Sequence, residues 1–367
     1  MVKICLCTDI YGAAGVGETA FQYSLAAKRK GIDFVISGFI ENAAAKYLPI
    51  IDKSSPKFVE KGVAGKVYAL NSENSKDVDL FVFFFDNGNF YDIDELPGAL
   101  EKITRIVPKE KSIVIDSDGK YNPTMYGNND CNHISKRAGR NWIKTFESLS
   151  DRIFQTTLKP SRENAESFVF WGYQEPKRKL KKRFDLLYLG SNWHKIDNIK
   201  KFMTHLDTIR NLYPRIAVSG KNWITQDSDW PKATIPDVNF FLERNIELKE
   251  QLTRFGEFTK TLSSSKYSPI LIRPILSKME IITPRMIETF ASGTIPVLTN
   301  DFYYAKDLYG KESHKLKLGE VPVEKLTDMQ INENEYVRIV KTIQSKLKAE
   351  HSYEQKLEQL LKIGGLK

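Results

Sequence analysis

The segment Glu280–Asp301, with the sequence EIITPRMIETFASGTIPVLTND, combines a helix signal with a strand signal and carries the clearest functional pattern of the chain. Thr283 is a good N-cap and Pro284 suits the first helical position, so a helix is predicted over residues 284–292. A glycine ends that helix, and the apolar run over residues 294–299 predicts a strand. A helix that returns directly into a buried strand is typical of an α/β fold.

Two charged residues on this helix point to a ligand. Arg285 falls in the first turn, where a cation opposes the helix dipole, although the free N–H groups of a helix start attract anions. A cation placed beside an anion site predicts a diphosphate ligand. Glu288 lies one turn later on the same face, where its carboxylate can accept hydrogen bonds from two ribose hydroxyls. The alternative is an ordinary α/β unit whose surface carries an Arg–Glu pair three residues apart.

The first forty residues predict another unit of the same class. An apolar strand over Val2–Thr8 is followed by a glycine loop over Gly12–Gly17, a helix over Glu18–Lys30 and a strand over Ile32–Ser37. This order argues for a parallel sheet with right-handed crossovers. The loop has the spacing Gly-x-x-Gly-x-Gly with Glu18 after it. It therefore departs from the dinucleotide-binding fingerprint and argues against a nicotinamide enzyme.

The remaining elements form two groups on either side of a basic segment. In the first half, strands are predicted over residues 67–70, 79–85, 112–115 and 152–155, with helical spacing over 134–149. In the second half, strands are predicted over 185–189, 215–219 and 268–273, and helices over 194–212 and 248–262. Between them, Glu175–Arg183 contains one acid, six basic residues and a proline. It indicates a surface connection, which is either merely solvated or in contact with a phosphate backbone.

These groups predict two domains, because 367 residues exceed the usual size of one hydrophobic core. We expect Rossmann-like α/β domains over residues 1–178 and 179–345, facing each other across a cleft. Residues 346–367 are expected to form a helix that packs back on the first domain. Ligands of such sheets bind at the carboxyl ends of the strands, so the cleft is the expected site.

The composition is that of an ordinary globular protein, with 41% hydrophobic and 28% charged residues. No apolar run reaches about 18 residues, so no membrane span is expected, and the N-terminus lacks a signal-peptide cleavage region. Cys5 and Cys7 are expected to be buried on one face of the first strand, which fits a reducing cytoplasm. The net charge of +9 permits nucleic acid, acidic lipid or phosphorylated substrates as partners.

Two acids follow the strand predicted over residues 112–115. Asp116 and Asp118 point to one face by strand alternation, and paired carboxylates raise each other's pKa, which suits a general base. Two alternatives remain open, namely a loop turn with Gly119 and an Asp-x-Asp site for a divalent metal. Asp86 ends another strand, where it either contacts an acceptor or forms a turn.

Basic and aromatic residues come next in the chain. Lys120, Lys136, Arg137 and Arg140 give this half the positive charge that a DNA acceptor requires. Aromatic residues near the expected cleft either stack on bases or sugars or belong to the core; they are Tyr121, Tyr126, Trp142 and Trp193. The residues expected to bind the acceptor are Asp86, Asp116, Lys120 and Tyr121.

The segment Glu280–Asp301 resembles the donor-binding signature of the GT-B glycosyltransferases, in which two glutamates separated by seven residues precede a small-residue helix end, a glycine and an apolar strand. The resemblance implies a GT-B fold, with an acceptor-binding domain over residues 1–178 and a nucleotide-sugar-binding domain over residues 179–345. It also implies that Glu288 contacts the donor ribose and that Glu280 lies near the sugar.

A second stretch, Asp185–Lys195, resembles the opening strand and loop of the donor domain in that family. Lys195 falls close to the place of a phosphate-binding lysine. Ser191 stands near the place of the usual arginine, which His194 or Arg273 would replace. The expected donor-binding residues are Gly15, Gly17, Gly190, Ser191, Lys195, Arg273, Arg285 and Glu288.

A narrower resemblance is to the DNA glucosyltransferases of T-even bacteriophages and to the CgeB-like spore-maturation proteins. It rests on the pattern Thr-x-Arg-x-x-Glu-x-x-Ala-Ser over Thr283–Ser292, on Gly-Thr-Ile-Pro-Val over Gly293–Val297 and on the N-terminal glycine loop. It implies transfer of a hexose from a nucleotide diphosphate sugar, UDP-glucose or similar, to a hydroxyl acceptor. A 5-hydroxymethylpyrimidine in phage DNA fits best, which would place the protein in the cytoplasm of the host.

The resemblance gives catalytic roles to Asp118 and Glu280. Asp118 as the base that deprotonates the acceptor favours inversion at the anomeric carbon, whereas Glu280 together with Glu288 favours retention, towards which the sequence leans slightly. No tightly bound cofactor is expected, and a divalent metal is compatible with the fold but not required. Two other functions stay open: transfer to a cell-surface or spore glycan, and a non-catalytic nucleic-acid-binding α/β protein with a degenerate donor site.

Overall fold

The fold is taken from a computed structural model of the whole chain. It describes residues 1–8, 15–38, 67–69, 75–85, 101, 103–122, 143–192, 195–225, 235–250, 252 and 256–366. Several residues singled out from the sequence lie outside this part, among them Asp86, Tyr126, Lys136, Arg137, Arg140, Trp142, Trp193 and His194. The predictions for these residues stay predictions.

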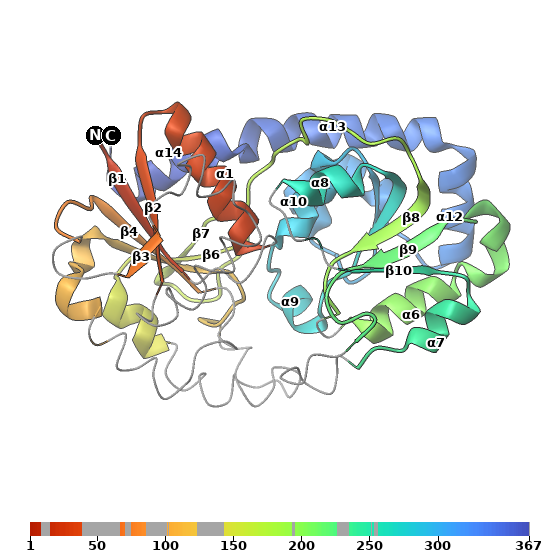
Figure 1. The fold of residues 1–367 in the computed structure, drawn as a ribbon, viewed down its shortest axis with the longest axis horizontal. Helices are drawn as coiled ribbons and strands as arrows, with labels where there is room; N and C mark the ends of the chain where they lie inside the picture. The colour runs from red at the N-terminus through yellow and green to blue at the C-terminus, as the bar shows by residue number, and fades with distance from the viewer. Residues whose placement is uncertain are drawn as a thin grey trace.

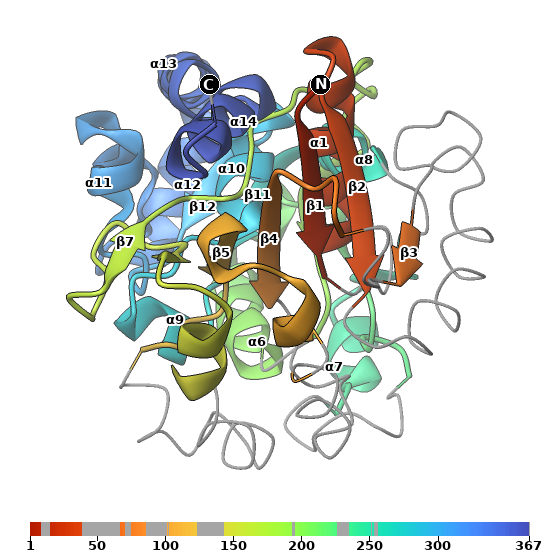
Figure 2. The same cartoon turned by 90° about the vertical axis from the view of Figure 1, so that its left-hand side faces the viewer.

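The first half of the chain forms a parallel sheet with the strand order β3-β2-β1-β4-β5-β6-β7 (Figure 2). The strands are β1 (Lys3–Cys7), β2 (Asp33–Gly38), β3 (Val67–Ala69), β4 (Leu80–Phe85), β5 (Ser112–Asp116), β6 (Ile153–Gln155) and β7 (Ala165–Ser167). In the register, Cys5 lies opposite both Val35 and Phe81, and all three side chains are fully buried. Apolar strands covered on both faces are typical of parallel sheets. The strand order reverses between β1 and β4, so the crevice of this sheet opens there.

The second half forms a smaller parallel sheet with the order β10-β9-β8-β11-β12. The strands are β8 (Phe184–Leu189), β9 (Ile216–Ser219), β10 (Glu247–Lys249), β11 (Ser265–Ile270) and β12 (Ile295–Leu298). The order reverses between β8 and β11, so residues that follow these two strands face the crevice of the second sheet. The expected α/β class, with two parallel sheets, is confirmed.

Helices cover both sheets (Figure 1). They are α1 (Val16–Arg29), α6 (Ile196–Thr204), α7 (Val238–Glu243), α8 (Glu257–Leu262), α9 (Pro274–Lys278), α10 (Pro284–Ala291), α11 (Ala305–Tyr309), α12 (Pro322–Ile331), α13 (Glu333–His351) and α14 (Tyr353–Ile363). Three 3₁₀ segments are η1 (Lys109–Lys111), η4 (Asp207–Leu212) and η6 (Lys311–Leu316). Side chains of α8 cluster with Leu187 and Leu189 of β8, and those of α6 cluster with the alternate residues Leu186 and Tyr188. The two helices therefore cover opposite faces of the second sheet.

Two predicted helices were wrong in extent. The helix expected over residues 194–212 is α6 followed by η4, because Ile209 has φ −121° and ψ 27° and breaks the helical path. The helix expected over 248–262 is in part the short edge strand β10, which pairs with β9 and is followed later by α8. A three-residue edge strand is too short to produce a readable alternation.

The two halves are joined by backbone and side-chain contacts as well as by the chain. Trp171 donates its indole N–H to the carbonyl of Ile282 at 2.7 Å, and the N–H of Ile282 donates to Thr156 O at 2.7 Å. Helix α14 returns to the first half, where Tyr353 meets Tyr23 of α1 edge-on with ring centroids 5.3 Å apart (Figure 1). One hydrophobic cluster therefore runs through both sheets.

The chain crosses between the halves at two places that touch each other. One crossing precedes β8, and the other is the turn between α13 and α14. The N–H of Tyr173 in the first crossing donates to the carbonyl of His351 in the second at 2.6 Å. Tyr173 and Ser352 also form a parallel β-bridge. The two crossings are thus held side by side.

Candidate donor and acceptor site

Helix α10 directs Arg285 into the crevice of the second sheet. Thr283 is the N-cap and Pro284 occupies the first turn, as predicted, and fully buried Ile287 anchors the helix on the sheet. Arg285 donates to the carbonyl of Leu189 at the end of β8, and its guanidinium lies 4.7 Å from the ring centroid of Tyr188. The alternative of a merely superficial Arg–Glu pair is therefore wrong, because the guanidinium is packed against the sheet.

The turn after β8 has room for Arg285 only because it begins with glycine. Gly190 has φ +151°, and a Cβ added there would overlap the Arg285 guanidinium. Gly220, at the end of β9, has φ +142° and packs against the Gly190 backbone with no space for a Cβ. The indole N–H of Trp223 donates to Gly190 O at 2.6 Å. Ser191 follows Gly190 in this rigid turn, so neither residue is free to move away from the arginine.

Three cations converge at this end of the second sheet. Burial lowers the pKa of Lys195 well below its ordinary value, and the positive charges of Arg285 and Arg273 act in the same direction. The charged groups that shift this pKa are thus both cations. Concentrated positive charge of this kind destabilises itself and favours a bound anion. The arrangement suits a diphosphate, for which arginine and lysine are the usual partners.

Glu288 is buried on the helix that carries Arg285. Burial raises the pKa of its carboxyl to about 8; the nearby Glu18 adds to the shift, and Arg285 opposes it. Near neutral pH this carboxyl is therefore mostly protonated. An ionised Glu288 would accept two hydrogen bonds, which is the chemistry that a ribose diol offers.

Glu18 belongs to the site, although the sequence pointed to it only as a departure from a fingerprint. It accepts hydrogen bonds from Gln22 Nε2 and from the N–H of Gly256, each at 2.6 Å. Burial raises its pKa as well. Gly256 stands just before α8 in the second half, so Glu18 bridges the two halves of the chain. An acid in the first turn of a helix is common, and nothing in the local pattern indicated a partner so far along the chain.

The expected donor glycines of the first half lie at the start of the helix that carries Glu18. Gly15 is the N-cap of α1 with φ +57°, and it has no side chain to satisfy the first N–H groups. Gly17 is buried in the first turn. The structure thus brings Gly15 and Gly17 to the start of α1, whose Glu18 reaches across to the second half.

Glu280 stands where the two halves meet. Its φ is +53°, an uncommon conformation for a residue other than glycine, and Lys159 Nζ lies 3.2 Å from its Oε2. The preceding carbonyl, that of Met279, accepts a hydrogen bond from Thr157 Oγ1 at 3.3 Å. Local backbone strain of this kind gathers at functional sites. Glu280 is therefore held at the junction by contacts from the first half.

Asp116 and Asp118 have different environments, although the sequence suggested a pair. Asp116 is fully buried and accepts hydrogen bonds from the N–H groups of Lys120 (2.8 Å) and Tyr121 (2.9 Å) and from Gln155 Nε2 (2.9 Å). Its pKa is raised by burial, not by a second carboxylate. Asp116 thus holds the turn after β5 in shape, and its carboxylate is already occupied by the protein.

Asp118, at the tip of that turn, is partly exposed and faces the donor side. Its Oδ1 lies 3.6 Å from Arg273 Nη2, and its Oδ2 lies 3.4 Å from Lys120 Nζ. The next residue, Gly119, has φ +75° and sits against Met279, since an added Cβ would come within 2.6 Å of Met279 Cε. The structure therefore brings the expected base and an expected donor-binding arginine together across the two halves.

Tyr121 lies in the core of the first half. Its hydroxyl donates to Glu147 Oε1 at 2.7 Å and accepts from Asn164 Nδ2 at 2.6 Å. Its ring stacks near Phe146 and lies under the Arg162 guanidinium at 4.7 Å. The side chain is fully buried, so in this conformation it does not present a stacking face to an acceptor.

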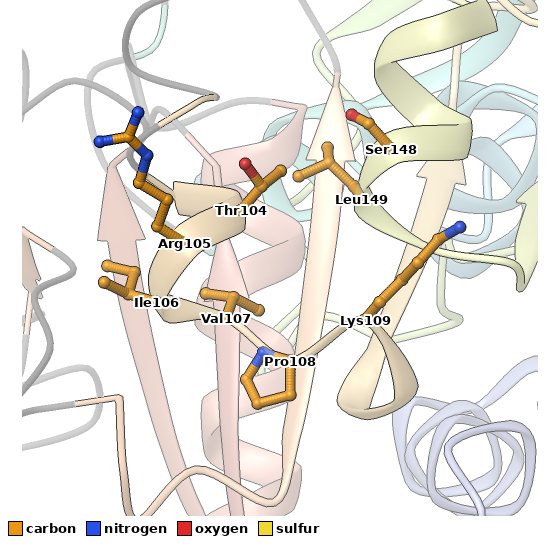
Figure 3. Close-up of a pocket in the computed structure, with 8 residues that line it drawn as sticks. All are labelled: Thr104, Arg105, Ile106, Val107, Pro108, Lys109, Ser148 and Leu149. Carbon is orange, nitrogen blue, oxygen red and sulfur yellow. The ribbon is translucent and has the colours of Figure 1, made fainter.

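A cavity of about 250 Å³ lies elsewhere in the first half (Figure 3). It is lined by residues 104–109 together with Ser148 and Leu149. None of these residues belongs to the site above. Across the described ranges, no group of three or more His, Cys, Asp or Glu side chains is placed to hold a metal ion. In the same part of the chain, no helix combines the length and the apolar character needed to span a membrane.

Comparison with solved structures places this geometry in a known fold. The chain matches an alpha-glucosyltransferase in complex with UDP at a TM-score of 0.61 and 10% identity, over 100% of both chains. It matches the beta-glucosyltransferase of T4 phage at 0.56 and 12% identity, again over 100% of both chains. It matches S. aureus TarM at 0.61 and 10% identity, over 99% of this chain and 100% of that chain. No protein-family model and no curated protein matches the sequence.

These likenesses cover essentially the whole length and agree with the two sheets described above. The chain has the GT-B fold, as the resemblance of Glu280–Asp301 implied.

Proposed function

We propose that this protein is a glycosyltransferase that moves a hexose from a UDP-sugar to a hydroxyl group. The observation that carries the proposal is the convergence of Lys195, Arg273 and Arg285 beside the buried carboxyl of Glu288. A cluster of cations next to an acceptor of hydroxyl hydrogen bonds matches a nucleoside diphosphate, which has charge at one end and a diol beside it. The GT-B fold supports this assignment by analogy.

In this proposal some residues bind the donor and others act on the acceptor. Arg285 and Lys195 neutralise the diphosphate and stabilise it as a leaving group, and Glu288 holds the ribose. The bond from the anomeric carbon to the phosphate oxygen breaks, and its electron pair leaves with UDP. The acceptor oxygen forms the new bond, and its proton goes to a base. Asp118, which lies 3.6 Å from Arg273 Nη2 and 3.4 Å from Lys120 Nζ, is the candidate base.

The stereochemical course follows from which group receives that proton. If Asp118 takes it while the acceptor attacks opposite the phosphate, the product is inverted. If a donor phosphate oxygen takes it on the same face, the product is retained, and Glu280 then lies beside the sugar. The lean towards retention rests on Glu280 and Glu288, and proton NMR of the product's anomeric centre distinguishes the two courses.

We propose a 5-hydroxymethylpyrimidine in duplex DNA as the acceptor. The net charge of +9 supports a polyanionic partner. Structures of the similar alpha-glucosyltransferase contain UDP and a 13-mer DNA with an HMU base. The donor base, uridine, is proposed on the same ground, because the similar structures contain UDP or UDP-glucose.

Transfer to a glycan is the second candidate. It is favoured by the likeness to TarM, whose structure holds fondaparinux, alpha-GlcNAc-glycerol and UDP. The third possibility, a DNA-binding protein without activity, requires a degenerate donor site. The packed positions of Arg285 and Glu288 argue against it.

The experiment has a donor arm and an acceptor arm. Protection of the chain from heat by UDP or UDP-glucose, but not by other nucleotides, is the expected donor result. Labelled UDP-glucose is then offered to duplexes with 5-hydroxymethylcytosine, with 5-hydroxymethyluracil or without modification, and to a glycopolymer with free hydroxyls. Label on the modified duplexes alone supports the DNA acceptor, and label on the glycopolymer alone replaces it. Absence of protection by every nucleotide would sink the enzyme proposal.

A further inference from the structure

The segment Lys177–Arg183 is an exposed run of positive charge between the two halves of the chain. Six of its seven residues are basic, and all seven are exposed. It enters β8 at the amino end of the strand, whereas the donor-site residues lie at the carboxyl ends. The run is therefore separate from the site described above.

Hydrogen bonds fix this run against the second sheet. The N–H of Leu180 donates to Ser263 Oγ at 2.8 Å, and the N–H of Arg183 donates to Ser264 O at 2.7 Å. The ammonium group of Lys182 donates to the carbonyl of Ser265. The segment is thus an ordered part of the fold, which distinguishes it from a loose solvated linker.

Helix α13 runs beside this segment (Figure 1). Lys348 Nζ lies 3.7 Å from Glu175 Oε1, and the side chains of Lys179 and Gln344 both approach Gly293. Residues three and four positions from Gln344 share its face of the helix. The exposed ones among them are Lys341 and Lys348, so the positive surface continues onto α13.

Ammonium groups crowd at one end of the run. Desolvation and the neighbouring Lys179 lower the pKa of Lys182 to about 8, and Lys266 acts in the same direction while Glu333 opposes the shift. Lys266 Nζ itself lies 3.2 Å from Glu333 Oε2. Lys182 thus lies close to two other ammonium groups, and the nearby carboxylate is already paired with Lys266. The mutual repulsion of the ammonium groups costs free energy that a bound anion would offset.

We infer that this basic face, defined as Lys177–Arg183 with Lys341 and Lys348, binds the phosphodiester backbone of duplex DNA. Seven extended residues reach at most about 25 Å, a length over which duplex DNA carries about 15 charges. Backbone contacts carry no sequence information and need only correctly placed cations. A membrane surface fits less well, because Leu180 is the one apolar residue of the run and the run has no aromatic anchor.

The face holds the acceptor polymer at a second place, away from the reacting base. The six residues of β8 separate the two ends of the sheet by about 20 Å. Backbone binding there raises the local concentration of target bases without competing for the donor site. This purpose rests on the proposed DNA acceptor, whereas the binding itself does not require the donor site.

The test compares two triple variants of the full chain that remove the same charge. The face variant is Lys177→Gln with Arg178→Gln and Lys181→Gln; the control is Lys76→Gln with Lys201→Gln and Lys362→Gln, all of which are exposed. Binding of an unmodified duplex of about 40 base pairs, roughly 136 Å long, is measured by fluorescence anisotropy across a range of salt. Heat protection by UDP is measured on the same samples.

We expect the face variant to bind at least about tenfold more weakly than the control at about 0.1 M salt, with a salt slope smaller by about two to three. Equal affinity and slope in the two variants would overturn the inference, as would a native chain that does not bind the duplex. The inference would also be overturned if the native chain bound phosphatidylserine vesicles more tightly than DNA and the face variant lost that vesicle binding. Absence of protection by UDP counts against the proposed function alone, because the duplex is measured without donor.

Discussion

The carboxylate of Glu18 accepts the backbone N–H of Gly256 at 2.6 Å and thereby ties the first helix of one half to the start of α8 in the other. Its second oxygen is held by Gln22, so the carboxylate is fully engaged although it is buried. The same carboxylate acts on the pKa of Glu288. The Glu18 side chain therefore makes a contact between the two halves and also raises the pKa of Glu288.

Removal of this carboxylate is expected to expose the Gly256 amide. In Glu18→Ala, hydrogen exchange at Gly256 should accelerate about tenfold or more, because a buried hydrogen bond of its amide is lost. Mass spectrometry of deuterium uptake in the peptide that contains Gly256 measures it. Glu18→Gln keeps an acceptor oxygen, so exchange at Gly256 should be faster than in the wild type and slower than in Glu18→Ala. Unchanged exchange in Glu18→Ala would mean that this bond does not protect the amide.

The buried carboxyl of Glu288 predicts a stability that falls as the pH rises. Its pKa of about 8 in the folded chain exceeds the ordinary 4.5, so the folded state keeps a proton that the unfolded state releases between these values. The stabilisation is complete below pH 4.5 and is lost as the pH rises through 8. Thermal unfolding of wild type and Glu288→Gln across this range should diverge by roughly 2–4 kcal/mol. Parallel curves would contradict the assigned pKa.

Donor binding is expected to release the proton of Glu288. An ionised carboxylate accepts hydrogen bonds from both hydroxyls of a ribose diol at its two oxygens, whereas a protonated carboxyl uses one oxygen as a donor, so UDP should expel close to one proton from this group at pH 7. Lys195, whose pKa is depressed, would take one up when the diphosphate arrives. Calorimetry of UDP binding in two buffers, applied to wild type and Glu288→Gln, isolates Glu288 because Lys195 is present in both. An identical proton balance in the two proteins would rule out ionisation of Glu288.

The close contact of Gly190 with Arg285 predicts loss of UDP binding in Gly190→Ala. An added Cβ would overlap the guanidinium, which must leave the end of β8. Gly319→Ala is the matched control, because Gly319 also has a positive φ, +71°, but has open space around its Cα. Protection by UDP should vanish in the first variant and persist in the second. Equal protection in both would show that the position of Arg285 does not govern binding.

The contrasting environments of Asp116 and Asp118 predict opposite phenotypes. Asp116→Ala removes a buried carboxylate with three hydrogen bonds and should lower stability by about 2–4 kcal/mol. Asp118→Asn leaves the partly exposed position nearly isosteric, so the fold should keep its melting temperature while transfer falls by a factor of about 100 or more. Thermal unfolding and initial rates measure the two effects. Full activity in Asp118→Asn would exclude it as the base.

The sequence predicted best where the signal is local. The helix that carries Arg285 and Glu288 followed from Thr283, Pro284 and a glycine, all within one short stretch, and the structure has it at the expected place. Parallel strands followed from apolar runs and turn residues. The break between α6 and η4 did not follow, because the apolar spacing continues through it and only the backbone at Ile209 departs from the helix.

The burial of individual residues and their contacts with distant parts of the chain could not be predicted from the spacing of residues in the sequence. Tyr121 and Asp116 were expected to bind the acceptor, with the core left open as an alternative for Tyr121. Packing of Tyr121 against Phe146 and a hydrogen bond from Gln155 to Asp116 place both inside. Glu18 was missed for the complementary reason, since its partner Gly256 is 238 positions away. A titratable residue reveals its role only when its neighbours are known, and those neighbours come from tertiary structure.

The paired crossings of the chain also limit how the halves can move. Because the N–H of Tyr173 donates a hydrogen bond to the carbonyl of His351, the two connections between the halves are held next to each other. A motion that slides the two crossings past each other would break the hydrogen bond between Tyr173 and His351. The hydrogen bond from Gly256 to Glu18 also joins the halves, as do the ion pairs Asp118–Arg273 and Lys159–Glu280, so all three must break when the halves separate.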